Sequence, residues 1–174
     1  MKRKDYRFCH MPDSASSVRE SKNILFFLIP VFFSLLADQV SKALIVNIFS
    51  PFDPPYEVIG SYLRFKIAYN PYGVFSISFG PPFLYYVFHI LGIIIFTYLG
   101  LSQNTKFRML LFGFIVGGAL GNIIDRIRLK YVVDFIDMGI GNLRWFTYNL
   151  ADAFVVVSAV LLIINELFYS RNKD

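Results

Sequence analysis

The chain has 174 residues, of which 56% are hydrophobic, 18% aromatic and only 17% charged, and its mean hydropathy is +0.54. This composition is more apolar than that of an average soluble domain and indicates a membrane protein with room for one bundle. The formal net charge of +5 does not indicate nucleic-acid binding, because the basic residues flank apolar runs, as is typical of membrane topology and lipid headgroup contact. The only cysteine, Cys9, excludes a disulfide or a cysteine-rich metal site within the monomer.

The chain begins with a basic segment followed by an apolar run. Residues 1–22 have almost no apolar periodicity, which predicts a disordered leader. The apolar run covers about residues 24–49 and is interrupted by polar residues between Asp38 and Lys42. A secretory signal peptide has a similar outline, but Leu35 lies where its cleavage site would need a small side chain. We therefore interpret this run as a membrane span.

The rest of the chain alternates between apolar runs and polar connections. From Pro51 to Pro82 the sequence is rich in Pro, Gly and Tyr, and the alternation from Tyr62 to Ala68 predicts a strand outside the bilayer. Three further spans are predicted at about residues 83–101, 109–125 and 149–169.

The predicted fold class is an all-α membrane bundle of four transmembrane helices. A small extracytoplasmic β-rich segment is expected between helices 1 and 2, and a connecting loop between helices 3 and 4. Residues 23–170 are expected to form a single membrane-embedded domain, and residues 171–174 a cytoplasmic tail.

Four spans place both termini on the same side of the membrane. The leader, the loop at residues 102–108 and the tail carry more Lys and Arg than the two other connections. The positive-inside rule therefore predicts cytoplasmic termini, with segments 50–82 and 125–148 on the outer side.

This topology gathers polar side chains near the outer face of the membrane. They come from three spans and from the connecting loop: Asp38, Lys42, Asn122, Asp125, Arg126, Asp134, Asn149 and Asp152. A charge inside a span costs on the order of 3 kcal/mol, so each such residue needs a partner or a function.

Most of these residues also have a purely structural interpretation. Asp38 and Lys42 are four residues apart and can neutralise each other on one helix face. Arg126 can extend to lipid headgroups. Asn149 is a favoured helix cap, and Asp152 suits the positive end of the helix dipole.

Asp134 is less easily explained in structural terms, because it lies in the apolar, strand-like run from Val132 to Ile136. Asp137, by contrast, is expected to be an exposed loop acid. His10 and His89 have no companions at ligand spacing, so neither a metal ion nor another cofactor is expected.

Without a usable cysteine or a metal site, the remaining candidate for catalysis is a pair of neighbouring carboxyl groups. One keeps its proton and polarises a carbonyl while the other activates water, which hydrolyses an amide. A proton or cation pathway and a partner-binding platform without chemistry are the alternatives, although the sequence has neither the repeats nor the midplane acids typical of transporters.

Taken together, the motifs resemble one family, the type II or lipoprotein signal peptidases of bacteria. The similarity spans about residues 24–169 and rests on five motifs in order. These are DQVSK (Asp38–Lys42), NPYGVF (Asn70–Phe75), GGALGNIIDR (Gly117–Arg126), VVDF (Val132–Phe135) and YNLADA (Tyr148–Ala153).

The resemblance implies a membrane aspartic endopeptidase that removes the signal peptide from diacylglyceryl-modified prolipoproteins by cleaving before the lipidated cysteine. It implies that Asp134 and Asp152 are the catalytic dyad. The positions that match supporting or substrate-binding residues of the family are Asp38, Lys42, Asn70, Gly73, Asn122, Asp125, Arg126 and Asn149.

The resemblance also implies the partners and the location. A lipidated prolipoprotein that enters from the membrane and membrane phospholipid are the expected partners, without nucleic acid. We expect a monomer in the bacterial inner membrane, with its active site near the extracytoplasmic face.

The chain departs from the family pattern at two positions. Gly73 follows Asn70 by three residues rather than the usual two. Tyr148 stands where Phe is usual before the Asn of the last motif, and its hydroxyl can add a hydrogen bond near the dyad.

Overall fold

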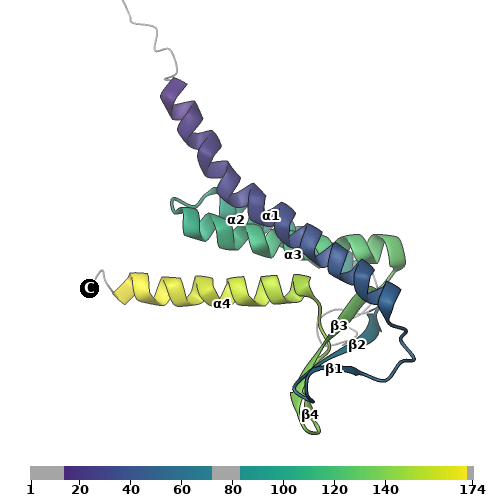
Figure 1. Cartoon of the computed structure of the whole chain (residues 1–174). Coiled ribbons are helices and arrows are strands. Elements are labelled where there is room, and N and C mark those ends of the chain that lie inside the picture. Colours follow the sequence, from purple (N-terminus) through teal and green to yellow (C-terminus); the bar gives the residue numbers. More distant parts are fainter. Residues whose placement is uncertain (1–13, 72–82, 172–174) are drawn as a thin grey trace, which may run out of the picture.

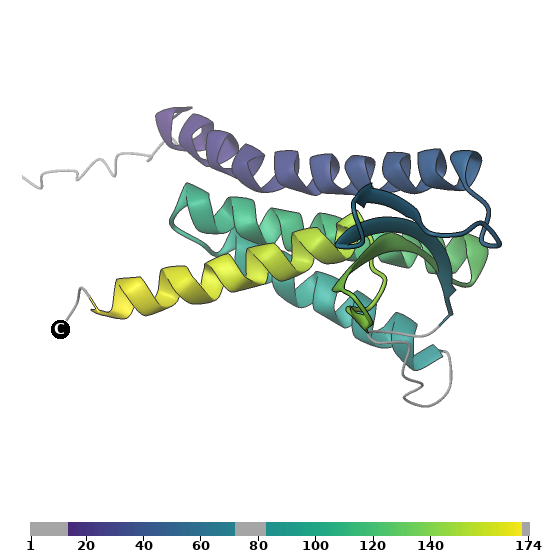
Figure 2. The same cartoon turned by 60° about the horizontal axis from the view of Figure 1, so that its bottom comes forward.

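A helical bundle carries a small sheet at one end, here called the sheet end (Figure 1). The computed structural model describes residues 14–71 and 83–171. The four helices are α1 (Ser14–Ile48), α2 (Phe83–Leu101), α3 (Lys106–Leu129) and α4 (Leu150–Arg171). The beginning of α1 and the end of α4 lie at the opposite end of the bundle from the sheet, as Figures 1 and 2 show.

All four helices are long and apolar enough to cross a membrane. The qualifying segments are Ile24–Ile48, Phe83–Leu101, Lys106–Leu129 and Leu150–Phe168. Large apolar side chains are exposed along these segments, as expected where lipid rather than water is the solvent. The predicted four-helix fold class is confirmed, and the predicted spans agree with these four segments to within a few residues at each end.

Helix α1 begins earlier than the sequence predicts. It starts at Ser14, whereas the sequence analysis expected a disordered leader that extends to residue 22. Once the apolar span has nucleated a helix, each residue added at its end gains a backbone hydrogen bond at little further cost. Residues 1–13 of the predicted leader lie outside the described residues.

Helix α3 is the centre of the bundle, because α1, α2 and α4 all pack against it. Two glycines permit the close approach of its neighbours. A Cβ atom added at Gly117 would collide with the carbonyl oxygen of Val31 on α1, and one added at Gly118 would lie 2.6 Å from the carbonyl oxygen of Ala151 on α4. Small residues at such contacts let helix backbones pack closely inside a membrane, where packing rather than water drives association.

The sheet has four antiparallel strands in the order β1-β2-β3-β4. The strands β1 (Tyr56–Ile59) and β2 (Leu63–Asn70) come from the segment between α1 and α2, as predicted. The strands β3 (Val132–Ile140) and β4 (Leu143–Arg144) lie in the connection between α3 and α4, where the sequence analysis expected a connecting loop with a strand-like run from Val132 to Ile136. The two connections of the bundle therefore form one sheet.

The end of α3 fixes the position of β3. Lys130 has a left-handed backbone conformation (φ 72°), and its N–H donates to the carbonyl oxygen of Arg126 at 3.1 Å. This cap ends the helix, so that β3 begins two residues later at Val132. Buried Ile67 of β2 and Phe135 of β3 then pack against Ile45 of α1, which holds the sheet on the bundle.

Asp137 is buried in β3, and its predicted exposure in a loop is wrong. Its side chain is 5% exposed and forms ion pairs with Arg64 of β2 at 2.6 Å and Arg144 of β4 at 3.0 Å. The two guanidinium groups compensate the cost of burying the carboxylate. Asp137 therefore joins three strands of the sheet.

Gly117→Ala tests the close packing of α1 and α3. We expect it to lower the free energy of unfolding by about 1–3 kcal/mol, because the added methyl group forces the helix backbones apart. The measurement is the thermal unfolding midpoint of the purified protein in detergent.

Gly92→Ala is the matched control, because nothing lies within 4 Å of a Cβ atom added there. In the middle of α2 this change should leave the midpoint unchanged or raise it slightly. Equal midpoints for both variants would contradict the packing described here.

Candidate active site

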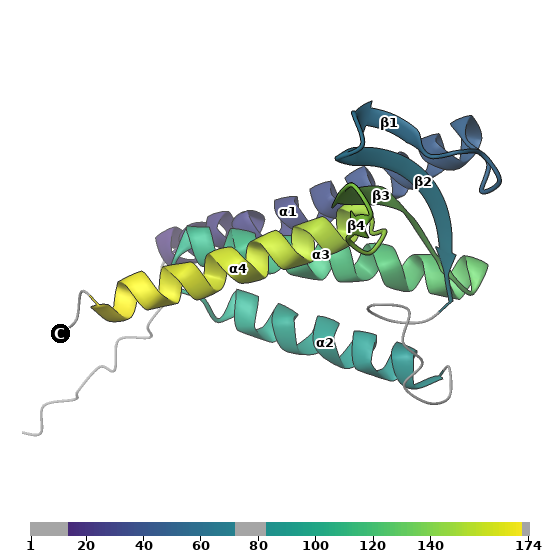
Figure 3. The same cartoon turned by 90° about the horizontal axis from the view of Figure 1, so that it is seen from below.

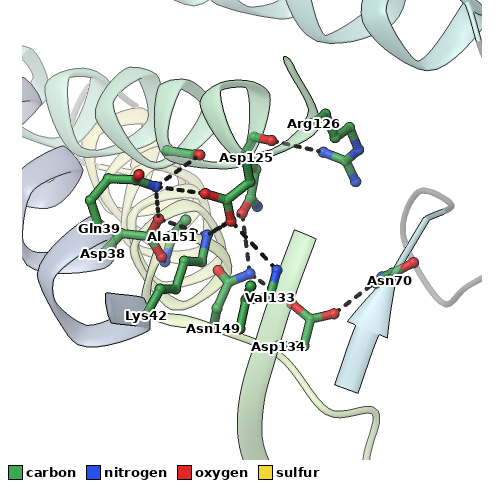
Figure 4. A network of polar contacts seen from close by, with 12 residues as sticks. Asp38, Gln39, Lys42, Asn70, Asp125, Arg126, Val133, Asp134, Asn149 and Ala151 are labelled. Atoms are coloured by element: carbon green, nitrogen blue, oxygen red, sulfur yellow. Dashed lines mark hydrogen bonds and ion pairs between the residues drawn. The ribbon is translucent and has the colours of Figure 1, made fainter. Parts of the chain in front are cut away.

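A buried lysine lies at the centre of the polar cluster at the sheet end. Lys42 projects from α1, and its ammonium group donates to Asp38 Oδ2 at 2.7 Å and to Asn122 Oδ1 at 3.0 Å. It also forms an ion pair with Asp125 Oδ2 at 2.8 Å. An ammonium group has three N–H donors, and here each has an acceptor, as Figure 4 shows for the two aspartates. The cluster joins α1 to α3.

Asp38 and Asp125 are held by further donors. Gln39 donates from Nε2 to Asp125 Oδ1 at 2.9 Å and to the carbonyl oxygen of Gly121 at 3.2 Å. The backbone N–H of Ala151, in the first turn of α4, donates to Asp38 Oδ1 at 3.0 Å. Asp38, which is fully buried, thus binds Lys42 on its own helix and the positive end of α4.

Asp152 is fixed by a reciprocal cap at the beginning of α4. Asn149 Oδ1 accepts from the backbone N–H of Asp152 at 3.0 Å, and Asp152 Oδ2 accepts from the backbone N–H of Asn149 at 3.4 Å. The other carboxyl oxygen, Oδ1, accepts from Asn122 Nδ2 at 2.8 Å. The structural and the functional interpretation of Asn149 and Asp152 are therefore compatible, because the cap orients the carboxyl group.

Asp134 lies on β3 and faces the same asparagines. Asn149 Nδ2 donates to Asp134 Oδ1 at 2.7 Å and to Asn122 Oδ1 at 3.1 Å, so two amides connect Asp134 to Asp152. Asn70 at the end of β2 donates to Asp134 Oδ2 at 3.1 Å, as Figure 4 shows. The structure thus brings together two carboxyl groups, one from a strand and one from a helix.

The backbone of Tyr148 links the beginning of α4 to β3. The carbonyl oxygen of Tyr148 accepts from the N–H groups of Phe135 and Ile136 at 3.0 and 2.8 Å, and the N–H of Tyr148 donates to Ile136 at 3.1 Å. The chain just before α4 is thereby paired with the part of β3 that follows Asp134.

Burial and charge raise the pKa of Asp134 to about 7. The larger cause is burial, since the residue is only 3% exposed, and repulsion from the Asp152 carboxylate adds to it. The amides of Asn70 and Asn149 and the charge of Lys42 act in the opposite direction. A carboxyl group with this pKa keeps its proton over much of the range below neutral pH.

Arg126 lies near the carboxyl groups of Asp134 and Asp152 and is also buried, with 6% of its surface exposed. Its guanidinium group is within electrostatic range of Asp152 and Asp134. Nη1 lies 3.5 Å from the carbonyl oxygen of Asn122 and 3.2 Å from Nε2 of His89 on α2.

Sequence reasoning missed two members of this cluster, Gln39 and His89. Gln39 lies within the first motif, and its place among apolar residues of a span could have revealed it. His89 was not among the predicted site residues, because it has no companion at ligand spacing in the sequence. Its partner, Arg126, lies on another helix, so the spacing of residues near His89 in the sequence does not predict this contact.

Of the predicted site residues, the structure brings nine together: Asp38, Lys42, Asn70, Asn122, Asp125, Arg126, Asp134, Asn149 and Asp152. The tenth, Gly73, lies outside the described residues. The prediction for Tyr148 is wrong, because its hydroxyl donates to Met138 Sδ at 2.7 Å and not to the dyad. Within residues 14–71 and 83–171, no three His, Cys, Asp or Glu side chains gather as metal ligands would.

Comparisons with known proteins agree on one family. The family model described as signal peptidase (SPase) II matches residues 30–168. A lipoprotein signal peptidase of Coxiella burnetii (strain RSA 493 / Nine Mile phase I) is 36% identical over 145 residues, which are 80% of this chain and 88% of that protein. A lipoprotein signal peptidase of Polynucleobacter necessarius subsp. necessarius is 33% identical over 89% of this chain and 97% of that protein.

The fold has solved counterparts as well. A structure described as a bacterial membrane enzyme has a TM-score of 0.75 and 28% sequence identity, and the similarity covers 88% of this chain and 92% of the other. A second structure with the same description has a TM-score of 0.71 and the same identity, over 84% and 93% of the two chains.

Lys42→Met tests whether the buried ammonium group holds the cluster together. We expect the free energy of unfolding to fall by about 3–5 kcal/mol, since Asp38 and Asp125 would remain buried without their shared cation. Denaturant titration in mixed micelles measures the loss.

Lys66→Met is the control, because Lys66 is an exposed lysine on β2. It should change the free energy of unfolding by no more than about 0.5 kcal/mol. If the two variants are equally stable, Lys42 does not have the stabilising role assigned to it.

Proposed function

Since this chain belongs to the signal peptidase II family of aspartic peptidases, we propose that Asp134 and Asp152 are the catalytic dyad with which it acts. Members of the family remove signal peptides from prolipoproteins, and the chain is such a peptidase, a multi-pass protein of the bacterial inner membrane. The assignment of the dyad rests on the two carboxyl groups that Asn122 and Asn149 connect.

The proposed reaction needs one protonated and one ionised carboxyl group. Asp134 is the acid, because its pKa of about 7 leaves it protonated below neutral pH. Asp152 is then the base that removes a proton from water as the water oxygen bonds to the carbonyl carbon. Asp134 gives its proton to the carbonyl oxygen. When the C–N bond breaks, the leaving amine takes the proton held by Asp152, and a hydroxyl group of the tetrahedral intermediate returns its proton to Asp134 as the carboxylic acid forms. The dyad thereby regains its starting state.

The other residues of the cluster hold the dyad in this state. Asn149 and Asn70 donate to Asp134, and Asn122 donates to Asp152, so the rotamers of both carboxyl groups are fixed before substrate binds. Lys42 and Arg126 supply positive charge beside the two carboxyl groups, which favours the ionised form of one of them.

The preferred bond is proposed to be the one before a diacylglyceryl-modified cysteine, as the resemblance to the family implies. A lipid-bearing substrate has to reach the dyad from the bilayer. Figures 2 and 3 show α2 and α4 diverging toward the sheet end. This divergence, next to Asp152 in the first turn of α4, supports lateral entry between these helices.

The orientation in the membrane is also a proposal. The excess of Lys and Arg in the leader, the short loop and the tail supports cytoplasmic termini, which would place the sheet and the dyad near the outer face. Exposed Trp145, just after β4, suits the headgroup region, where phospholipid would contact the protein. We propose that the protein acts as a monomer, because both carboxyl groups come from one chain.

Asp134→Asn and Asp152→Asn test the dyad. Each should lower kcat for a diacylglyceryl-modified precursor in detergent by at least about a thousandfold, because neither amide can transfer the proton that the reaction needs. The change is isosteric, so the thermal midpoint should remain close to that of the wild type.

Asp53→Asn is the matched control, since Asp53 is an exposed acid between α1 and β1. It should cleave at the wild-type rate. Full activity of either dyad variant would refute the assignment. A precursor that carries unmodified cysteine forms a second arm of the assay, and equal cleavage of both precursors would refute the proposed preference for the lipid.

The pH profile tests the assignment of Asp134 as the acid. Above about pH 7, the pKa of Asp134, both carboxyl groups are ionised and no proton is available for the carbonyl oxygen. We therefore expect kcat/KM to fall on the alkaline side, with a slope that approaches tenfold per pH unit, and to fall again in acid when both groups are protonated. A rate that is flat between about pH 5 and pH 9 would contradict the shared-proton scheme.

A further inference from the structure

His89 contacts the cluster although it lies on α2, the one helix that contributes no residue to the predicted site. Its side chain is half-buried, whereas Phe88 and Ile90 beside it are exposed to the outside of the bundle. One ring nitrogen, Nδ1, lies 2.8 Å from the carbonyl oxygen of Tyr85, and the other, Nε2, lies 3.2 Å from Nη1 of Arg126. Both ring nitrogens are therefore engaged.

The two contacts determine the protonation state of the ring. A carbonyl oxygen can only accept, so Nδ1 carries a hydrogen and donates to Tyr85. A guanidinium group can only donate, so Nε2 must be the unprotonated nitrogen that accepts from Arg126. A doubly protonated ring would place two donors and two positive charges 3.2 Å apart. The geometry thus requires neutral His89 with its hydrogen on Nδ1.

Two residues of α2 hold the last turns of α3. Tyr86 lies three residues before His89 on the same helix face, and its hydroxyl donates to the carbonyl oxygen of Arg126 at 2.9 Å. Tyr86 therefore holds the backbone of Arg126, whereas His89 holds its side chain. The second contact restricts the rotamers of the long arginine side chain.

The position of the Arg126 guanidinium matters to the dyad. It lies within electrostatic range of Asp152 and Asp134, and Nη1 also lies 3.5 Å from the carbonyl oxygen of Asn122, whose side chain donates to Asp152. A cation that moved away would change the field at both carboxyl groups, because Coulomb interactions are strong in a buried site.

We propose that His89 is a positioning residue, which holds the Arg126 guanidinium beside the dyad by accepting a hydrogen bond at Nε2. The inference rests on the proposed function of Asp134 and Asp152. It predicts that full kcat requires a hydrogen-bond acceptor at the position of Nε2. An apolar side chain of similar size, with or without a ring, should therefore not restore kcat.

Three substitutions of His89 separate this role from packing. His89→Phe keeps a ring but has no acceptor, and we expect kcat to fall about tenfold, which is about 1.4 kcal/mol, with KM within about twofold of the wild type. His89→Gln places an amide oxygen near the Nε2 position and should retain kcat within about threefold. His89→Asn places its amide near Nδ1, leaves the Nε2 position empty and should resemble His89→Phe.

The measurement is cleavage of a diacylglyceryl-modified precursor in detergent, with the thermal midpoint of each variant determined in parallel. Phe88→Leu is the matched control, because Phe88 is exposed on the neighbouring position of α2. If His89→Phe does not fold, the pair of Gln and Asn variants decides, since both are polar and differ by one methylene. Equal kcat values for this pair, whether high or low, would overturn the proposal.

A double-mutant cycle tests whether His89 acts through Arg126. Arg126→Lys should itself lower kcat, and adding His89→Phe to it should cost less than about twofold, because the interaction has already been lost. Additive losses would overturn the proposal. Failure of this inference is distinguishable from failure of the proposed dyad: if Asp134→Asn and Asp152→Asn are inactive while His89→Phe is fully active, only the inference about His89 fails.

Discussion

The structure of the sheet end depends on the burial of one ammonium group. Lys42 is 4% exposed, and burying a cation costs several kcal/mol unless acceptors surround it. Two of its acceptors, Asp125 and Asn122, belong to α3, and the third, Asp38, belongs to α1. The three can meet only if the two helices have one relative register and lie close together. The glycines of α3, such as Gly117, permit this closeness, so packing and ion pairing specify the same arrangement.

The hydrogen bonds that stabilise the beginning of α4 are also those that orient the proposed dyad. The N–H of Ala151 is satisfied by Asp38, and the N–H of Asp152 by Asn149. A helix needs such acceptors in any case, because its first N–H groups have no partners within the helix. Here the acceptors are side chains that also hold Lys42 and Asp134. The same side chains therefore cap the helix and form the site. This is why Asn149 and Asp152 could be interpreted as helix caps from the sequence alone.

The sequence was sufficient for features that depend on local patterns. Spans follow from runs of apolar residues, and nine of the predicted site residues lie in motifs whose order matches the family. The features that were missed depend on contacts distant in sequence. The burial of Asp137 requires Arg64, which is 73 residues away, and an antiparallel register interrupted by a bulge. The contact of the Tyr148 hydroxyl with Met138 requires that β3 has formed. The contact of His89 with Arg126 requires that α2 packs against α3.

The distribution of charge supports the proposal that the pair of Asp134 and Asp152 retains a proton. Among the described residues, the cluster contains the carboxyl groups of Asp38, Asp125, Asp134 and Asp152, and the cations Lys42 and Arg126. Lys42 is directly paired with Asp38 and Asp125, so its charge is already more than balanced. Arg126 is then the cation nearest the dyad that remains, and one positive charge can balance only one of two carboxylates. The second keeps its proton because water cannot stabilise another buried negative charge there, which is the state that amide hydrolysis by two carboxyl groups requires.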